Sequence, residues 1–546
     1  MSKARKLTLF NVFLYAKSQS FFFVILSAAA ACLDVYLRRY MGIIVDGLQE
    51  DIHTINWLLI GITVPVFLIL KYILPWLKTQ TTHTLLEKIR EQLVYKALHT
   101  EQKALEQMDP GTVSTYYMSD VDGIVRYAGR ILEIGIPDIL IFVLSVLAVA
   151  LMDPYLSLAA VLSSIVPVLA MYFMSRALVK KNMDYQASLE RINQSVGGRL
   201  YNLEFIKANR MEAALEKENA ALLDALHREK KALSKREAAL SFPTMITSFL
   251  TVLIVALLGG YFVLTSRMSI GSLFSAIALT DYIVSPVMRF QNTISQIRRA
   301  SANVSRINAF LETKNESAVI HHIQDGKDQF VSITAHNLSF SYSEDKPVLK
   351  GINIHWEAGK LNVLVGQNGT GKSTFLKLLT GLFPVDDGQI QLGGAVISDA
   401  PDVDVLRKKI TVDTQNTLLL PGTIWYNLTL GADLDRNTVD EACRKAGLYE
   451  EIQHLAVDYD TYLDDDGKPL SGGQKRRLCF ARTLLKDAPI YVFDEPTVGV
   501  DPNHISIIIS TLKTLAKEKL VVVITHDQSI IQEADTVTHI GIGGLS

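Results

Sequence analysis

The chain has 546 residues, enough for roughly two to four domains and more than a single hydrophobic core requires. Hydrophobic residues make up 49% of it and charged residues 20%, and the mean hydropathy is +0.22, so a disordered or collagen-like chain is excluded. The 54 Lys and Arg nearly balance the 56 Asp and Glu, and this net charge of −2 provides no general attraction for nucleic acid.

The apolar residues gather in the first part of the chain. Before about residue 315, six stretches approach the roughly 20 residues with which a helix crosses a bilayer. They lie at residues 17–37, 56–77, 133–152, 155–175, 243–265 and 270–288. Later windows alternate short β-branched runs with helical patterns. We therefore expect an all-α membrane domain of six spanning helices over residues 1–315, a linker over 316–330 and a soluble α/β domain over 331–546.

The distribution of Lys and Arg predicts the side of the membrane on which each loop lies. The long connections after the second and fourth stretches are rich in both, whereas the short loops near residues 49–56 and 152–155 contain neither. Cytoplasmic loops carry the excess of basic residues, so we expect a multi-pass protein of the bacterial cell membrane with both termini in the cytoplasm. Residues 85–105 and 187–240 show helical spacing, which predicts helical extensions beyond the membrane. The alternative is that these segments are solvated and unrelated to function.

A phosphate-binding loop is the most specific motif of the soluble half. The sequence GQNGTGKST follows a strand-like run and precedes a helical pattern, which is the context that this motif requires. Its glycines let backbone N–H groups turn towards phosphates, and the helix N-terminus adds its positive dipole end. Lys372 is expected to contact the β and γ phosphates of ATP, and Ser373 to bind Mg²⁺. The loop consists of Gly366, Gln367, Asn368, Gly369, Thr370, Gly371, Lys372, Ser373 and Thr374.

An acidic pair follows the buried-strand pattern of residues 490–493. We interpret Asp494 as a ligand of Mg²⁺ and Glu495 as the residue that orients or deprotonates the attacking water. Alone, such a pair is more often a solvated turn, but the phosphate loop upstream favours the catalytic interpretation.

The sequence LSGGQ at residues 470–474 resembles the signature motif of the ATP-binding cassette (ABC) ATPases. This resemblance implies that Ser471, Gly472, Gly473 and Gln474 bind a nucleotide held by the opposite subunit, which makes dimerisation part of the active site. Other residues match the family in the expected order: Tyr342 as the aromatic that stacks on adenine, Gln415 as the Q-loop glutamine and a further Mg²⁺ ligand, Asp501 as the D-loop aspartate, and His526 as the switch histidine. Glu495, His526 and Gln415 would then be the catalytic residues.

Six spans followed by one cassette resemble an ABC half-transporter of the exporter type. The resemblance implies ATP-driven export of an amphipathic small molecule, lipid or peptide, with alternating access of a dimer in the bilayer and without a nucleic-acid partner. The chain keeps both Glu495 and an intact signature, so a homodimer is favoured over a heterodimer.

Three other functions are compatible with parts of the pattern. An exporter-like membrane domain also serves import of siderophore-like ligands. A non-transport ABC ATPase would act on ribosomes or DNA, but six spans and the lack of a basic face oppose it. The third alternative is a redox-linked or regulatory ATPase.

Two features leave questions open. Exporters of the family commonly have Ser-Ala-Leu-Asp where this chain has VGVD at residues 498–501, in a loop that communicates between the two sites. Within the first span, Asp34 and Arg38 are four residues apart on one helical face, so they either neutralise each other or face a cavity.

Overall fold

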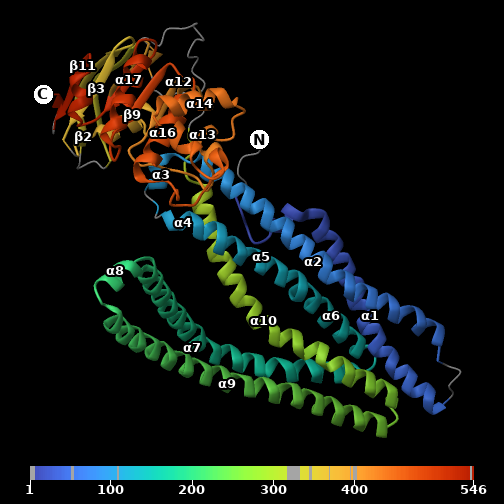
Figure 1. Ribbon diagram of the computed structural model, residues 1–546. Coiled ribbons are helices and arrows are strands. Elements are labelled where there is room, and N and C mark those ends of the chain that lie inside the picture. Colours follow the sequence, from blue (N-terminus) through green and yellow to red (C-terminus); the bar gives the residue numbers. More distant parts are fainter. Residues whose placement is uncertain are drawn as a thin grey trace. The chain divides into compact units, whose positions relative to one another are not determined.

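The computed structural model divides the chain into two compact units (Figure 1). It describes residues 6–50, 55–106, 108, 110–316, 332–342, 347–367, 369–393, 395–396, 403–541 and 544–545. The first unit comprises Met1–Leu98 and Gly111–Glu312, and the second comprises His99–Pro110 and Thr313–Ser546. Residues 99–110, which the sequence placed in the membrane domain, therefore group with the second unit.

The first unit is entirely helical in the part that the structure describes. A short 3₁₀ helix, η1 (Asn11–Ala16), leads into α1 (Lys17–Glu50). The other helices are α2 (Trp57–His99), α4 (Pro110–Thr115), η3 (Tyr116–Asp120), α5 (Val121–Arg130), η4 (Ile131–Gly135), α6 (Ile136–Ala150), α7 (Pro154–Tyr201), α8 (Leu203–Ala208), α9 (Glu212–Leu264) and α10 (Ile270–Leu311). The π-helical turns η3 and η4 join α4, α5 and α6 into one continuous path.

Side-chain caps fix where two of these helices begin. Asp153 accepts hydrogen bonds from the backbone N–H groups of Tyr155 and Leu156 at 2.8 and 3.1 Å, and Pro154 occupies the first turn of α7. Ser269 caps α10 by accepting from the N–H of Ser272 at 3.0 Å. Each cap fixes the helix start at a polar residue that separates two apolar stretches, so the turns before α7 and α10 lie at these polar residues.

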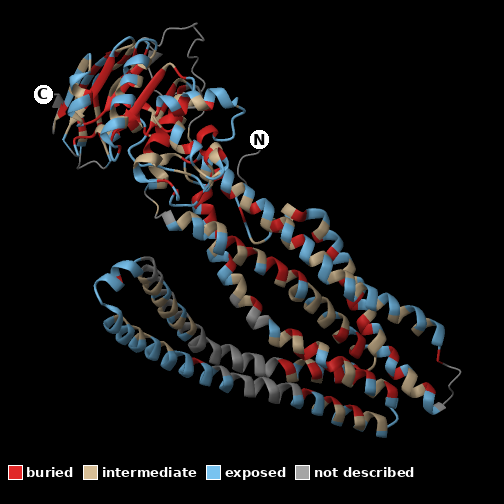
Figure 2. Ribbon diagram, viewed as in Figure 1, coloured by how far each residue is buried: buried red, intermediate tan, exposed pale blue. Residues whose placement is uncertain are grey.

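Several helices are long and apolar enough to span a membrane. Among the described residues these are Asn11–Gln49, Trp57–His99, Gly111–Ala150 and Ile270–Arg289, and the shorter apolar helices Pro154–Ser164 and Phe249–Leu264 belong to α7 and α9. With 48 and 53 residues, α7 and α9 are much longer than a span of about 20 residues. They run side by side and are joined through α8 (Figure 1), and the surface of α9 is largely exposed around residues 212–236 (Figure 2).

Close packing joins the first and last long helices. A Cβ at Gly42 of α1 would lie 2.1 Å from the carbonyl oxygen of Gly271 in α10, so only glycine permits this approach. Asp46 accepts hydrogen bonds from the N–H of Gly271 and the hydroxyl of Ser269, both at 2.7 Å. One buried apolar cluster of this unit is formed by Val35, Ala148, Val149, Leu156, Ala160, Val255, Ala276, Leu279 and Ile283.

The second unit is built on a six-stranded sheet with the order β12-β11-β3-β10-β9-β6. These strands are β12 (Gly544–Leu545), β11 (Thr536–Gly541), β3 (Leu361–Gly366), β10 (Leu520–Ile524), β9 (Ile490–Asp494) and β6 (Ile410–Asp413). Only β12 pairs antiparallel within this sheet. A second, antiparallel sheet has the order β2-β1-β4-β5, with β2 (Pro347–Glu357), β1 (Ser332–Ser341), β4 (Asp387–Leu392) and β5 (Ala395–Val396).

Helices cover the parallel sheet, and two apolar cores lie on its faces. Alternate residues of β10 enter different cores: Leu520, Val522 and Ile524 join one, whereas Val521 and Val523 join the other. The strands are accordingly buried along their length (Figure 2). The remaining elements are α3 (Gln102–Glu106), α11 (Lys372–Leu379), α12 (Val403–Lys409), β7 (Gly422–Thr423), α13 (Ile424–Thr429), α14 (Arg436–Lys445), α15 (Tyr449–Gln453), η5 (Asp458–Asp460), β8 (Tyr462–Leu463), α16 (Gly472–Leu485), α17 (Pro502–Ala516) and α18 (Gln528–Gln532). The observed fold is therefore the expected one, a helical membrane domain followed by an α/β domain.

Candidate active site

Four of the predicted segments follow neighbouring parallel strands. The phosphate loop follows β3, His526 follows β10, the acidic pair lies at the end of β9, and Gln415 follows β6. In the register, Ile524 of β10 is opposite both Leu364 and Asp494. Because carboxyl ends of parallel strands lie at one edge of a sheet, these segments meet there, where ligands of α/β folds commonly bind.

Two glycines shape the phosphate loop between β3 and α11. Gly369 and Gly371 have φ angles of 84° and 96°, which side chains other than glycine rarely adopt. A Cβ at Gly371 would also lie 2.5 Å from a side-chain carbon of Leu349. Thr370 stabilises the turn by donating from its hydroxyl to the carbonyl of Gln367 at 2.8 Å. The shape of the loop is thus held by its own backbone and by the hydroxyl of Thr370.

Lys372 already occupies the loop with its ammonium group. It donates to the carbonyls of Gly366 and Gln367, the latter at 3.2 Å. Ser373 is exposed at the start of α11, as a hydroxyl that meets a phosphate-bound ion must be. Asn368 lies outside the described residues.

Glu495 is buried in an unusual backbone conformation. Its φ of 54° is in the left-handed region, and its N–H donates to the carbonyl of Ile524 at 2.8 Å. The carboxylate accepts a hydrogen bond from the hydroxyl of Thr525 at 3.0 Å, and its other oxygen lies 2.7 Å from Nδ1 of His526. The side chain of His526 is 75% exposed, whereas that of Glu495 is 7% exposed. A buried carboxylate thus contacts an imidazole that lies at the surface.

Asp494 is buried beside Glu495. Burial and the neighbouring charge of Glu495 raise the pKa of Asp494, while Arg476, Lys372 and a backbone hydrogen bond from Gln415 lower it. A carboxylate whose pKa is still raised at such a place favours a bound cation, because a cation offsets both the desolvation and the charge repulsion.

A buried arginine of α16 organises this edge of the sheet, and the sequence analysis did not identify it. Arg476 is 2% exposed, lies 3.3 Å from a carboxylate oxygen of Asp413 and donates to the carbonyls of Thr414, Gln415 and Asp494. The guanidinium, whose donors are fixed in a plane, therefore connects the Q-loop with the end of β9.

Tyr342 lies on the aromatic side of the site. Its ring is 41% exposed and makes edge contacts with Phe340 and Phe383 at centroid distances of 5.2 and 5.6 Å. Its hydroxyl lies 3.2 Å from Oγ1 of Thr374, the last residue of the phosphate loop. The exposed aromatic surface beside that loop suits a base that stacks on it.

The helix α3 contacts this aromatic side through an ion pair. Glu106 accepts a hydrogen bond at 2.9 Å from Lys377, whose ammonium also lies 5.7 Å from the ring centroid of Tyr342. Burial lowers the pKa of Lys377, but the hydrogen bond to Glu106 and the neighbouring tyrosine raise it more, so the net shift is upward.

The signature residues begin α16. Ser471 caps it by accepting from the N–H of Gln474 at 3.3 Å, and its own N–H donates to Oε1 of Gln474 at 2.8 Å. Gly472 has open space at its Cβ position, whereas a Cβ at Gly473 would lie 2.7 Å from the carbonyl oxygen of Gly499. The D-loop therefore packs directly against the signature of the same chain.

A charged network extends this contact to Asp501. Glu451 accepts hydrogen bonds from Gln474 and Arg477, both at 2.7 Å, and lies 3.6 Å from His504. His504 contacts Asp501 at 2.6 Å, and this hydrogen bond lowers the pKa of Asp501. Signature and D-loop are thus linked despite the unusual VGVD sequence.

The donor groups fit Mg²⁺ that arrives with a nucleotide. Asp494 supplies a buried carboxylate, and Ser373 and Gln415 supply neutral oxygens, which are the ligands that Mg²⁺ prefers. No group of three His, Cys, Asp or Glu side chains among the described residues is arranged to hold a metal ion.

Two family models match separate parts of the chain. Residues 19–287 match the ABC transporter transmembrane region, and residues 349–498 match the family described as ABC transporter. The matches fall in the helical unit and in the α/β unit, respectively.

Individual relatives span most or about half of the chain. An uncharacterized ABC transporter ATP-binding protein of Bacillus subtilis is 28% identical over 82% of this chain and 78% of its own length. The pediocin PA-1 transport/processing ATP-binding protein of Pediococcus acidilactici is 25% identical over 96% of this chain and 73% of its own length. An ATP-dependent lipid A-core flippase of Syntrophus aciditrophicus is 32% identical, over 51% of this chain and 46% of its own length. The solved structure of a bacterial Atm1-family ABC exporter with ATP bound has a similar fold, with a TM-score of 0.80 and 22% identity over 96% of this chain and 93% of that one.

Proposed function

Because the chain belongs to the ABC transporter family, as a half-transporter of the exporter type, we propose that it exports an amphipathic small molecule, lipid or peptide across the bacterial cytoplasmic membrane. It is a multi-pass membrane protein that binds ATP and couples ATP hydrolysis to transport, and a half-transporter acts together with a second subunit. One observation carries the proposal: the phosphate loop, the acidic pair and the switch histidine meet at one sheet edge in a chain that also has membrane-spanning helices.

In this proposal, Lys372 exchanges its two loop carbonyls for the β and γ phosphates of ATP. The exchange replaces hydrogen bonds to neutral acceptors with charge-assisted ones, which are stronger. Tyr342 stacks on the adenine. Ser373, Gln415 and Asp494 would hold Mg²⁺, which would supply positive charge to offset that of the phosphates.

Hydrolysis requires a rearrangement at Glu495. Its carboxylate is now occupied by Thr525 and His526, so His526 must turn towards the γ-phosphate before Glu495 can orient a water molecule. The exposure of His526 leaves room for that movement. In this mechanism the bound nucleotide draws His526 away from Glu495, and Glu495 can then orient the attacking water.

The second subunit completes each site with its signature. Ser471, Gly472, Gly473 and Gln474 are expected to contact the γ-phosphate held by the opposite chain, through backbone N–H groups at the N-terminus of α16. We favour a homodimer because Glu495 and the signature are both present. ATP then stabilises the closed pair by its higher affinity for that state, and this difference drives the change in access of the membrane domain.

Polar groups of the spanning helices support an amphipathic substrate. Asp34 accepts a hydrogen bond from the hydroxyl of Tyr282 at 2.6 Å and pairs with Lys71 at 3.3 Å. Of the two alternatives for Asp34 and Arg38, the structure favours separate partners, because Arg38 lies over the ring of Tyr282, 3.7 Å from its centroid. Arg289 forms a two-bond ion pair with Asp138. Charges of both signs at membrane depth suit a molecule with polar and apolar parts.

Transport in inverted membrane vesicles tests the proposal against import. Export predicts ATP-dependent accumulation of a fluorescent amphipathic probe inside such vesicles, and none with Glu495→Gln. ATP-dependent loss of preloaded probe would instead show import. ATP hydrolysis without movement of any probe from a panel of lipids, peptides and amphipathic drugs would favour the regulatory alternative.

A further inference from the structure

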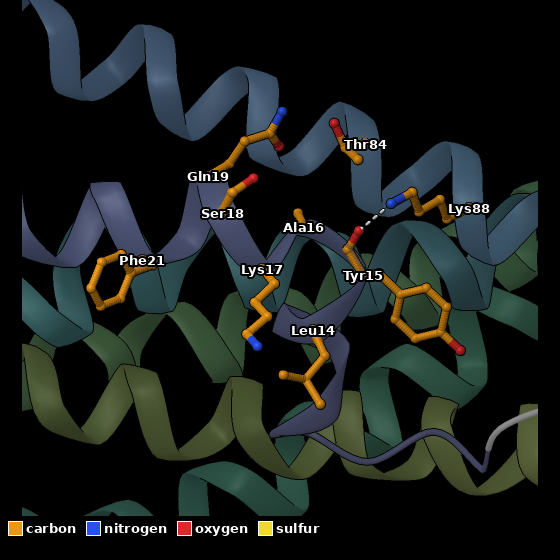
Figure 3. Close-up of a pocket in the computed structure, with 9 residues that line it drawn as sticks. All are labelled: Leu14, Tyr15, Ala16, Lys17, Ser18, Gln19, Phe21, Thr84 and Lys88. Atoms are coloured by element: carbon orange, nitrogen blue, oxygen red, sulfur yellow. Dashed lines mark hydrogen bonds between the residues drawn. The ribbon is translucent and has the colours of Figure 1, made fainter.

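A cavity of about 570 Å³ lies where the chain enters its first membrane-spanning helix. Three elements line it: η1, the first turn of α1, and α2 near Thr84 and Lys88 (Figure 3). The cavity is far along the chain from the nucleotide-binding residues, and the export mechanism assigns it no role.

The cavity is cationic. Lys17 and Lys88 are among its lining residues, and no Asp or Glu is. Lys88 donates one hydrogen bond, to the carbonyl of Tyr15 at 2.6 Å, which is drawn in Figure 3 and leaves two N–H donors of the ammonium for another acceptor. Lys17 is exposed on the side of η1. Figure 3 shows the side chain of Lys17 on the side of α1 away from α2, so an anion in the cavity would accept from Lys88 and be attracted by the charge of Lys17 from a greater distance.

Neutral polar groups next to the lysines indicate what the anion carries. The side-chain oxygen of Gln19 is buried and has no hydrogen-bond partner, and Figure 3 shows this side chain rising towards α2. A buried acceptor without a donor is unfavourable, so a ligand that brings a hydroxyl group would be preferred here. Ser18 and Thr84 add hydroxyl groups to the lining.

Exposed apolar side chains continue from the cavity along the same segment. Phe21 lines the cavity and is 62% exposed, Phe22 is 59% exposed, and Leu14 of η1 is 46% exposed. They belong to the apolar segment Asn11–Gln49, whose length suits a membrane span. A ligand with acyl chains can therefore lie along α1 while its head fills the cavity.

We infer that this cavity binds the headgroup of an anionic phospholipid that carries hydroxyl groups, as phosphatidylglycerol does. The phosphodiester accepts hydrogen bonds from Lys88, the charge of Lys17 adds attraction, and a headgroup hydroxyl donates to Gln19. The position at the start of the first span, on the side expected to be cytoplasmic, matches the leaflet whose anionic lipids attract basic residues. The inference requires membrane insertion but no particular transported substrate.

Native mass spectrometry of the purified full-length protein, without ATP, tests it directly. Phosphatidylglycerol should be retained in preference to phosphatidylcholine, and Lys17→Gln and Lys88→Gln should each lower its retention about fivefold. Lys231→Gln, the same change at an exposed position of α9, is the matched control and should have no effect. Equal retention by the wild type and both cavity variants would overturn the inference.

Two further experiments identify which chemical groups of the ligand the cavity recognises. Phosphatidylmethanol has the same charge but no headgroup hydroxyl, so the wild type should prefer phosphatidylglycerol, and Gln19→Leu should remove that preference. Inorganic phosphate at millimolar concentration should not displace the lipid. Displacement would show a site for free anions and would contradict a lipid site. Because no nucleotide or substrate is used, a failure of the export proposal would leave this result unchanged.

Discussion

Glu495 is the residue whose surroundings most constrain a mechanism. Its left-handed backbone is fixed by a hydrogen bond to β10, and its carboxylate is buried between Thr525 and His526. A strained, buried acid of this kind persists where function requires it.

Glu495→Gln should therefore remove the general base while keeping a side chain of nearly the same size and shape. We expect turnover to fall about 10²- to 10⁴-fold, because a positioned general base contributes that much, while ATP binding persists. Steady-state hydrolysis and binding of a fluorescent nucleotide analogue measure the two effects separately. Lys372→Ala is the contrasting variant and should weaken binding itself. Near-normal turnover of Glu495→Gln would refute the assignment.

The buried pair of Asp413 and Arg476 makes stability depend on pH. Burial raises the pKa of Asp413 to about 6 from its ordinary 3.8, although Arg476 opposes the shift. The folded state then binds a proton that the unfolded state has released, so stability should fall as pH rises from 3.8 to about 6. Thermal unfolding of the detergent-solubilised protein measures this slope. Asp413→Asn should flatten it, and an unchanged slope would show that other groups cause it.

The sequence predicted the residues whose motifs have fixed spacing and failed for Arg476. Phosphate loops and acidic strand ends require particular residue types at short spacing, so they can be identified without a structure. Arg476 contacts Thr414 and Gln415, which are more than sixty residues away along the chain, and an arginine beside Lys475 and Arg477 usually indicates a solvated helix face. One signal was its position four residues before Phe480, on the buried side of α16.

At the scale of secondary-structure elements, residues 99–110 have the most specific role. They follow α2 in the chain but group with the α/β unit, where Thr100 forms a β-bridge with Asn315 and α3 contacts Lys377. Lys377 in turn lies beside the ring of Tyr342. A change at Tyr342 can therefore reach α3 through one ion pair.

Reversal of this ion pair should alter ATP hydrolysis. Glu106→Lys and Lys377→Glu each create like-charge contacts, and we expect each to lower turnover by about two- to fivefold, the range of a partly exposed pair. The double variant should recover most of the activity, since it restores opposite charges. If the double variant is no better than the singles, the pair does not couple the two elements.

Membrane topology provides an independent prediction for the long helices. A cysteine in place of Glu50 should react with an impermeant thiol reagent from outside the cell, whereas one in place of Lys230 should react only after permeabilisation. The background should lack Cys32, the only exposed cysteine among the described residues. The opposite labelling pattern would invert the orientation and the proposed direction of transport.

Hydropathy located the helices of the membrane unit but not their full extent. Every apolar stretch falls largely within a long helix, because a segment that must satisfy its backbone in lipid is helical. The π-helical turns at Tyr116–Asp120 and Ile131–Gly135 have no comparable signal. They depend on local packing, which composition does not encode.

For the whole molecule, the central claim is that a complete nucleotide site needs two chains. Ser471 and Gln474 form their own capping box, and no hydrogen bond or ion pair between described residues joins residues 471–474 to the phosphate loop of the same chain. The contact of Gly473 with Gly499 and the network around Glu451 then connect each signature to the D-loop of its own chain.

Complementation between two inactive variants tests this claim most directly. The purified protein alone should hydrolyse ATP as a homodimer, and Lys372→Ala and Ser471→Arg should each abolish turnover. A mixed dimer contains one site in which the intact phosphate loop of the Ser471→Arg chain faces the intact signature of the Lys372→Ala chain. If signatures act across the dimer, co-expressed and doubly tagged mixed dimers should regain ATP hydrolysis far above either variant. If each signature served its own chain, no site would be intact, and mixed dimers as inactive as their parents would contradict the account.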